Sequence, residues 1–206
     1  MFDPNYIYYK AALIPGIILG LTLHEYAHAK VADMLGDPTP RLLGRVTLDP
    51  LKHLDPLGTL LIFVLGFGWA KPVPITPSNI RGNQRLGEIW ISLAGPGANL
   101  VLAFVSMLIM NWFGPGLGSI GLTIVKMSVS INILLAALNL IPIPPLDGSS
   151  LVMNLWKRPP GWVYFLHNNG MVVLILLMLT GVLSKILYPV MAVFQIVLGT
   201  LAGLIS

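Results

Sequence analysis

Long uninterrupted stretches of apolar residues limit how this chain can fold. They approach 20 residues in length, which is what an α-helix needs to cross the hydrocarbon core of a bilayer. They lack the ten-residue alternation of membrane β-strands, so helices are the expected structure. Only 10% of the 206 residues are charged, whereas a water-soluble domain has about a quarter. The sequence therefore predicts an all-α polytopic membrane protein in which residues 1–206 form one domain.

Five to six transmembrane helices are expected from these apolar stretches. The core spans are predicted at about 10–35, 87–112 and 119–142. Two C-terminal spans are predicted at about 163–184 and 186–205.

The connection between the first two spans is predicted to form a small β-hairpin with a re-entrant segment, over about 41–80. Residues 45–49 alternate polar and apolar side chains, which is typical of a strand with one wet face. The apolar run 57–67 is too short to cross a bilayer, so it indicates a re-entrant or half-buried segment. The prolines of residues 66–74 restrict that stretch to an edge strand or a loop. Its two interpretations are an edge that pairs with an extended peptide and a structural hairpin that plugs the bundle.

Basic residues gather in the same connection. They are Arg41, Arg45, Lys52, Lys71, Arg81 and Arg85. Positive charge favours the cytosolic side of a membrane, so the predicted topology has the N-terminus outside and the third span ending in the cytosol. No basic patch is interleaved with stacking aromatic residues, so the sequence predicts no nucleic-acid partner.

The motif His24-Glu25-Tyr26-Ala27-His28 interrupts the first predicted span. Residues four apart share a helix face, so both imidazoles can reach one Zn²⁺, with Glu25 beside it as a candidate general base. The pattern fixes only three positions and also occurs in proteins that bind nothing. Ionisable groups inside a membrane are nevertheless costly and usually functional. Because the chain has no cysteine, any metal must have nitrogen and oxygen ligands.

Asp147 is the predicted third ligand. An Asp-Gly pair is usually a simple turn, but Asp147 follows the prolines that end the third span. It is also, of the eight acidic residues, the one that terminates a span with a polar face. That face is made by Ser128, Asn132 and Asn139. The charge topology puts Asp147 at the same cytosolic depth as the two histidines.

Asn99 lies in the second predicted span, after a Pro96 break. Its amide has two interpretations. It satisfies a backbone group that Pro96 frees, or it points at a reaction centre.

Together these residues resemble the site-2 protease family of intramembrane zinc metalloproteases, peptidase family M50. The resemblance is strongest to the short bacterial and archaeal branch without a PDZ domain, and it covers nearly the whole chain. It is carried by His24-Glu25-x-x-His28, Gly95-x-x-x-Asn99, the Asn139-to-Gly148 run that ends Pro-Pro-Leu-Asp-Gly, and residues 43–48 and 69–74.

The resemblance implies one Zn²⁺ per chain, bound by His24, His28 and Asp147, with Glu25 as the general base. It implies that Asn99 and Asn139 help to bind or polarise the substrate. It also implies a multi-pass enzyme of a bacterial or archaeal membrane. Such an enzyme cleaves membrane-anchored proteins near the cytosolic side, in regulated intramembrane proteolysis. The oligomeric state is not indicated.

Two histidines have no assigned role in this scheme. His53 is interpreted as a loop residue, with a place near the metal as the alternative. His167 is interpreted as an interfacial side chain.

A different class of function remains open from the residues alone. A membrane metal-ion transporter or a metal-binding scaffold could use the same His/Asp site, because intramembrane His and Asp also line ion pathways. Two observations weigh against it: the halves of the chain show no inverted repeat, and Glu25 has no evident transport partner at its depth.

Overall fold

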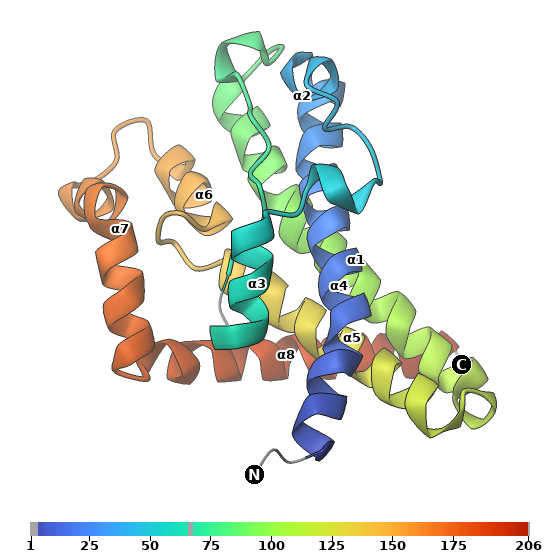
Figure 1. Ribbon diagram of the computed structural model, residues 1–206. Coiled ribbons are helices and arrows are strands. Elements are labelled where there is room, and N and C mark those ends of the chain that lie inside the picture. Colours follow the sequence, from blue (N-terminus) through green and yellow to red (C-terminus); the bar gives the residue numbers. More distant parts are fainter. Residues whose placement is uncertain (1–3, 66–67, 206) are drawn as a thin grey trace.

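Figure 1 shows the computed structural model, which describes residues 4–65 and 68–205. The regular elements of these residues are all helices. The α-helices are α1 (Pro4–Met34), α2 (Thr39–Leu42), α3 (Pro56–Leu65), α4 (Gln84–Phe113), α5 (Gly118–Asn139), α6 (Asp147–Leu155), α7 (Gly161–Leu179) and α8 (Val182–Ile205). Short 3-10 helices lie at Pro50–Lys52, Pro77–Asn79 and Gly114–Gly116.

Among the described helices, four are long and apolar enough to cross a membrane. They are α4 with the 3-10 turn that follows it, α5, α7 and α8. The prediction of five to six spans is therefore matched only in part, by four helices. The predicted first span at about 10–35 falls in α1, which is not among these four helices.

The predicted β-hairpin is wrong. Within the described part of residues 41–80 there is no strand, and one isolated antiparallel bridge joins Leu54 to Ala70. Most of the apolar run 57–67 forms α3. Residues 66 and 67, which begin the predicted edge segment, lie outside the described residues.

A side chain explains why this connection stays extended without a sheet. The guanidinium of Arg45 is buried and donates hydrogen bonds to the backbone carbonyls of Lys71 and Pro72. Those carbonyls therefore need no hydrogen-bond donor from a neighbouring strand. Pro72 and Pro74 also lack the N–H groups that a ladder requires.

The centre of the molecule is a three-helix unit made of α1, α4 and α5, whose mutual contacts are the most extensive in the described structure. Gly16 and Gly20 lie one turn apart on α1, on the face that meets α5. A Cβ atom built on Gly16 would lie 2.8 Å from the Cα of Ser128, and one built on Gly20 would collide with the side chain of Asn132. The two glycines thus allow the α1 and α5 backbones to approach closely.

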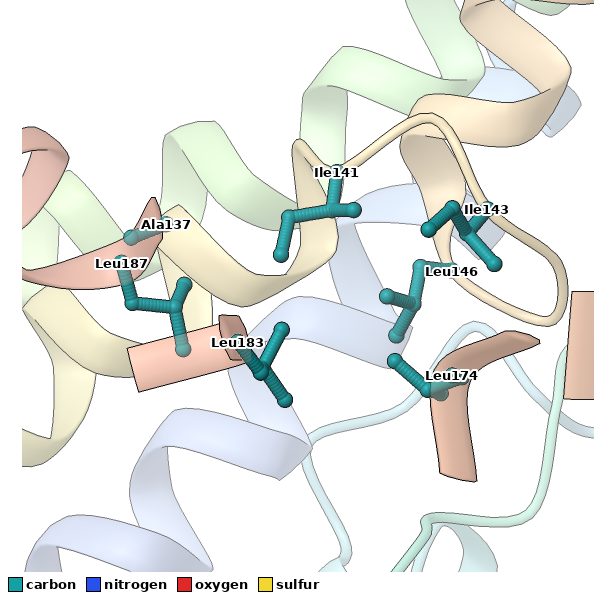
Figure 2. Close-up of a cluster of buried hydrophobic side chains, with 7 residues drawn as sticks. All are labelled: Ala137, Ile141, Ile143, Leu146, Leu174, Leu183 and Leu187. Carbon is teal, nitrogen blue, oxygen red and sulfur yellow. The ribbon is translucent and has the colours of Figure 1, made fainter. Parts of the chain in front are cut away.

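A cluster of buried apolar side chains fixes the segment that leads from α5 into α6 (Figure 2). Its members come from the end of α5, from residues 141–146, from α7 and from α8; they are Ala137, Ile141, Ile143, Leu146, Leu174, Leu183 and Leu187. Leu146 is the residue immediately before α6. Its burial anchors the start of that helix in the cluster.

The two ends of the connection between α1 and α4 are joined by Asp37, whose side chain is completely buried. Its carboxylate accepts hydrogen bonds from the backbone N–H and hydroxyl of Thr39, from the Thr76 N–H and from the Asn79 amide, at 2.6–3.0 Å. Burial alone would raise the pKa of Asp37, but these hydrogen bonds lower it below its ordinary value. We refer to these four residues as the loop clamp.

Candidate metal centre

Three side chains from two distant parts of the sequence meet at one point. His24 and His28 lie one turn apart on α1, and Asp147 is the first residue of α6. The Nε2 atoms of the two histidines are 3.0 Å apart, and Oδ2 of Asp147 lies 3.1 Å and 3.2 Å from them. Within the described residues, this is the one group of three His, Cys, Asp or Glu side chains whose ligand atoms cluster in this way.

Both imidazoles are held through their other nitrogen by groups of α4. Nδ1 of His28 is 2.7 Å from the carbonyl oxygen of Ile91, and Nδ1 of His24 is 2.7 Å from Oδ1 of Asn99. A carbonyl oxygen can only accept a hydrogen bond. Nδ1 of His28 therefore carries a proton, and in the neutral ring its Nε2 presents a lone pair to Asp147.

The arrangement fits a divalent cation. Oδ2 of Asp147 is buried and has no hydrogen-bond partner in the described structure. A carboxylate oxygen and an Nε2 lone pair repel each other unless a proton or a metal ion lies between them. In a tetrahedral zinc site with ligand distances of about 2.0–2.1 Å, neighbouring ligand atoms are about 3.3 Å apart. The separations of 3.0–3.2 Å are close to that value.

Gly95 of α4 provides the room for this cluster. A Cβ atom built there would lie 2.6 Å from Nε2 of His24 and would collide with Nε2 of His28. The neighbouring Gly97 has no atom within 4 Å of such a Cβ. The absence of a side chain at Gly95 is thus a steric requirement of this His–His–Asp cluster.

The position of Asp147 is controlled from both ends of α6. At its start, a Cβ on Gly148 would collide with the backbone oxygens of Leu140 and Ile141, which follow α5, so only glycine allows this close approach. At its end, Arg85 of α4 donates to the carbonyl oxygen of Asn154 at 2.9 Å, and the Asn154 amide donates to Glu88 at 2.9 Å. These contacts tie the short helix to α4.

Glu25 lies between the two histidines in sequence and is 8% exposed. Burial lowers the pKa of Arg45, and attraction to the negative charge of Glu25 opposes that shift. The guanidinium that holds the Lys71–Pro72 segment therefore also lies within electrostatic range of Glu25.

The side chain of Asn99 is completely buried and fully engaged in hydrogen bonds. Besides its contact with His24, its amide nitrogen donates to the carbonyl of Gly20 at 3.0 Å and to Oδ1 of Asn132 at 2.9 Å. Asn139, by contrast, is half-buried at the end of α5 and donates to the carbonyl of Leu135 in its own helix.

Neither of the two remaining histidines belongs to this cluster of three. His53 is completely buried in the connection, where its Nε2 donates to the carbonyl of Thr47 at 2.8 Å. His167 is exposed on α7.

Three residues that shape the centre were missed by sequence reasoning. Gly16 and Gly20 form a small-xxx-small pair on α1, a signal that could have predicted a close helix contact one turn from the histidines. Nothing in the sequence distinguishes Arg45 from the other basic residues of its loop, so its burial was not predictable.

Comparison with known proteins adds three findings. Residues 117–183 match the model of peptidase family M50. Two relatives bear the name "Putative zinc metalloprotease". YwhC of Bacillus subtilis is 38% identical over 91% of this chain and 90% of its own length, and Rip2 of Mycolicibacterium smegmatis is 28% identical over 88% of this chain and 71% of its own. No solved structure matches the chain significantly.

Proposed function

The chain belongs to peptidase family M50, and on that premise we propose that it is a zinc-dependent endopeptidase of membrane-spanning proteins. The observation that carries the proposal is the meeting of His24, His28 and Asp147. The candidate ligand atoms of these three residues lie close together. One of them, Oδ2 of Asp147, is buried and has no hydrogen-bond donor in the described structure.

These three residues would hold one zinc ion per chain. The chemistry that zinc supplies when bound is Lewis acidity, which lowers the pKa of a water molecule to about 7 and polarises a carbonyl group. The protein orients both imidazoles so that the lone pair of each Nε2 would face the zinc ion. It does so through the two groups of α4 that accept hydrogen bonds from their Nδ1 atoms.

Glu25 is proposed as the general base that takes a proton from the attacking water and passes it to the leaving amine. Its place supports this role, because Glu25 is a buried residue of α1 that directly follows His24. Asn139 is a candidate for contact with the substrate, since it lies half-buried at the end of α5 near the start of α6.

The substrate is proposed to be a membrane-anchored protein, cleaved near the cytosolic side of a bacterial or archaeal membrane. Four apolar helices of spanning length support a location in the bilayer. The basic connection between α1 and α4 supports a cytosolic location for that connection, because positive charge favours the cytosolic side. The proposed topology has α1 crossing the bilayer to an N-terminus outside.

The decisive test compares two substitutions. Glu25→Gln removes the base but no proposed ligand, so zinc content should stay at one per chain while cleavage of a membrane-anchored reporter falls by at least about a hundredfold. Asp147→Ala removes a ligand, so both zinc content and cleavage should fall. The readouts are metal analysis of the purified protein and reporter cleavage in membranes.

Retained cleavage in Glu25→Gln would contradict the assigned base. Undiminished zinc in Asp147→Ala would contradict the assigned ligand. Zinc flux into proteoliposomes that survives Glu25→Gln would favour a transporter instead.

A further inference from the structure

A chain of hydrogen bonds runs from backbone carbonyls to His24, and its direction can be worked out step by step. It begins at Asn132 of α5, whose amide nitrogen donates to the carbonyls of Gly16 at 3.3 Å and Ser128 at 2.9 Å. Because carbonyl oxygens only accept, the amide of Asn132 cannot be turned the other way without leaving two acceptors facing its oxygen. Its Oδ1 therefore faces Asn99 as an acceptor.

The same reasoning fixes the amide of Asn99. Its nitrogen has two acceptors in front of it, Oδ1 of Asn132 and the carbonyl oxygen of Gly20. Its oxygen must then be the atom that faces Nδ1 of His24, at 2.7 Å. An amide oxygen accepts a hydrogen bond, so Nδ1 of His24 carries the proton and Nε2 keeps its lone pair.

We propose that Asn99 is a positioning residue for the metal centre: held in one orientation by Gly20 and Asn132, it fixes the His24 tautomer that presents Nε2 to zinc. The proposal rests on the metal site proposed above. It gives Asn99 a role different from substrate contact, and its complete burial supports this, because no surface of the side chain is left for a substrate.

The packing of the three central helices makes this chain of hydrogen bonds possible. The amide of Asn132 donates to the carbonyl of Gly16, and the amide of Asn99 donates to the carbonyl of Gly20. Both carbonyls belong to glycines of α1, which have no side chain to cover them. A Cβ on Gly20 would collide with Oδ1 of Asn132. The glycine pair thus exposes to buried amides two backbone carbonyls that larger residues would cover.

Three variants separate a positioning role from a structural one. Asn99→Leu keeps the approximate size but removes the acceptor of the His24 proton. Asn99→Asp keeps an oxygen that accepts this proton but loses the donors to Gly20 and Asn132. Ser106→Ala is the matched control: Ser106 is a buried α4 residue that bonds the hydroxyl of Ser128, outside the chain that ends at His24.

Two quantities are measured on each purified full-length variant. The first is the zinc dissociation constant, from competition with a chromogenic chelator. The second is the thermal unfolding midpoint of the metal-free protein, which reports packing without the metal.

The expected results differ in a characteristic way. Asn99→Leu should weaken zinc binding about 10-fold to 100-fold, the usual effect of losing a group that orients a ligand histidine. Asn99→Asp and Ser106→Ala should both lower the metal-free unfolding midpoint, yet keep zinc affinity within about threefold of the original protein.

The proposal is overturned if Asn99→Leu binds zinc as tightly as the original protein, or if Ser106→Ala weakens zinc binding as much as Asn99→Leu does. If Asn99→Leu does not fold, Asn99→Asp decides, because a loss of zinc affinity beyond about threefold in a folded Asn99→Asp protein also overturns it. An unmodified protein that binds no zinc would instead refute the metal site itself.

Discussion

A methyl group added at Gly95 would lie 2.6 Å from Nε2 of His24, inside the space that the ligand atoms share. Overpacking of this kind costs about 1–3 kcal/mol. Gly95→Ala is therefore expected to weaken zinc binding by roughly 10-fold to 100-fold, because the imidazoles must move apart. The measurement is zinc affinity of the purified protein.

Gly97→Ala is the control for that substitution. It adds the same methyl group two residues further along α4, where no atom lies within 4 Å. Equal zinc binding by the Gly95→Ala and Gly97→Ala proteins would show that Gly95 does not provide room for the ligands.

At the scale of single residues, the members of the cluster could be named from the sequence and their supports could not. His24, His28 and Asp147 stand out because ionisable groups are rare in apolar stretches and metal ligands come from few residue types. The contact of Asn99 with His24 depends on the rotation of α4 about its axis, which helical spacing within one segment does not specify. The Asn132 contact depends in addition on how closely α5 approaches α1.

At the scale of elements, α6 carries Asp147 and is tied to α4 at its far end. Arg85→Ala removes the hydrogen bonds to the carbonyl of Asn154. If these hydrogen bonds contribute about 1 kcal/mol to holding α6 in place, their loss should weaken zinc binding roughly fivefold. This effect is smaller than the effect of losing a ligand. Arg158→Ala, in the exposed loop after α6, is the control and should leave zinc affinity unchanged. An unchanged affinity in Arg85→Ala would mean that α6 holds Asp147 in place without this tether.

The loop clamp gives the connection between α1 and α4 a pH dependence. Because the pKa of Asp37 is lowered on folding, the unfolded chain binds its proton first as the pH falls through 3.8. The contribution of the ionised Asp37 carboxylate to the stability of the fold is thus complete above that pH. It is lost as the pH falls towards the lower pKa of Asp37 in the folded state. Asp37→Asn should cost about 1–3 kcal/mol at pH 7, since an amide cannot accept all the hydrogen bonds that the carboxylate accepts.

The measurement is the thermal unfolding midpoint in detergent from pH 7 to pH 3, for the original protein and for Asp37→Asn. The difference between the two should shrink as the pH falls below 3.8. Asp49→Asn, which alters an exposed cap of the 3-10 helix, is the control. If the difference in unfolding midpoint between the original protein and Asp37→Asn stayed constant down to pH 3, the role of the ionised Asp37 carboxylate in the loop clamp would be contradicted.

The same connection shows why an element can be predicted wrongly from a good pattern. The alternation of residues 45–49 suggested a strand with Arg45 on its wet side, but Arg45 is buried and binds backbone carbonyls. One side chain thereby replaces a strand partner, and the periodicity of a sequence cannot reveal such a replacement. Helices were easier to predict, because each satisfies its own backbone hydrogen bonds.

At the scale of the whole molecule, the proposed orientation can be tested directly because the chain has no native cysteine. Lys52→Cys lies in the exposed part of the basic connection, and Gly116→Cys lies in the open turn between α4 and α5. In intact cells a membrane-impermeant maleimide should label the Gly116→Cys protein. The Lys52→Cys protein should be labelled only after permeabilisation. The reverse result would place the metal centre on the outer side.

The buried amides also have a consequence for how the protein is made. A ribosome synthesises about 5–20 residues per second, so α1 leaves it several seconds before Asn99 and Asn132 exist. During that interval His24, Glu25 and His28 have none of their partners from α4 and α6, and each is costly in lipid. We therefore expect the helix that carries these three residues to be a poor membrane anchor by itself. We also expect the stable insertion of α1 to depend on its packing against α4 and α5.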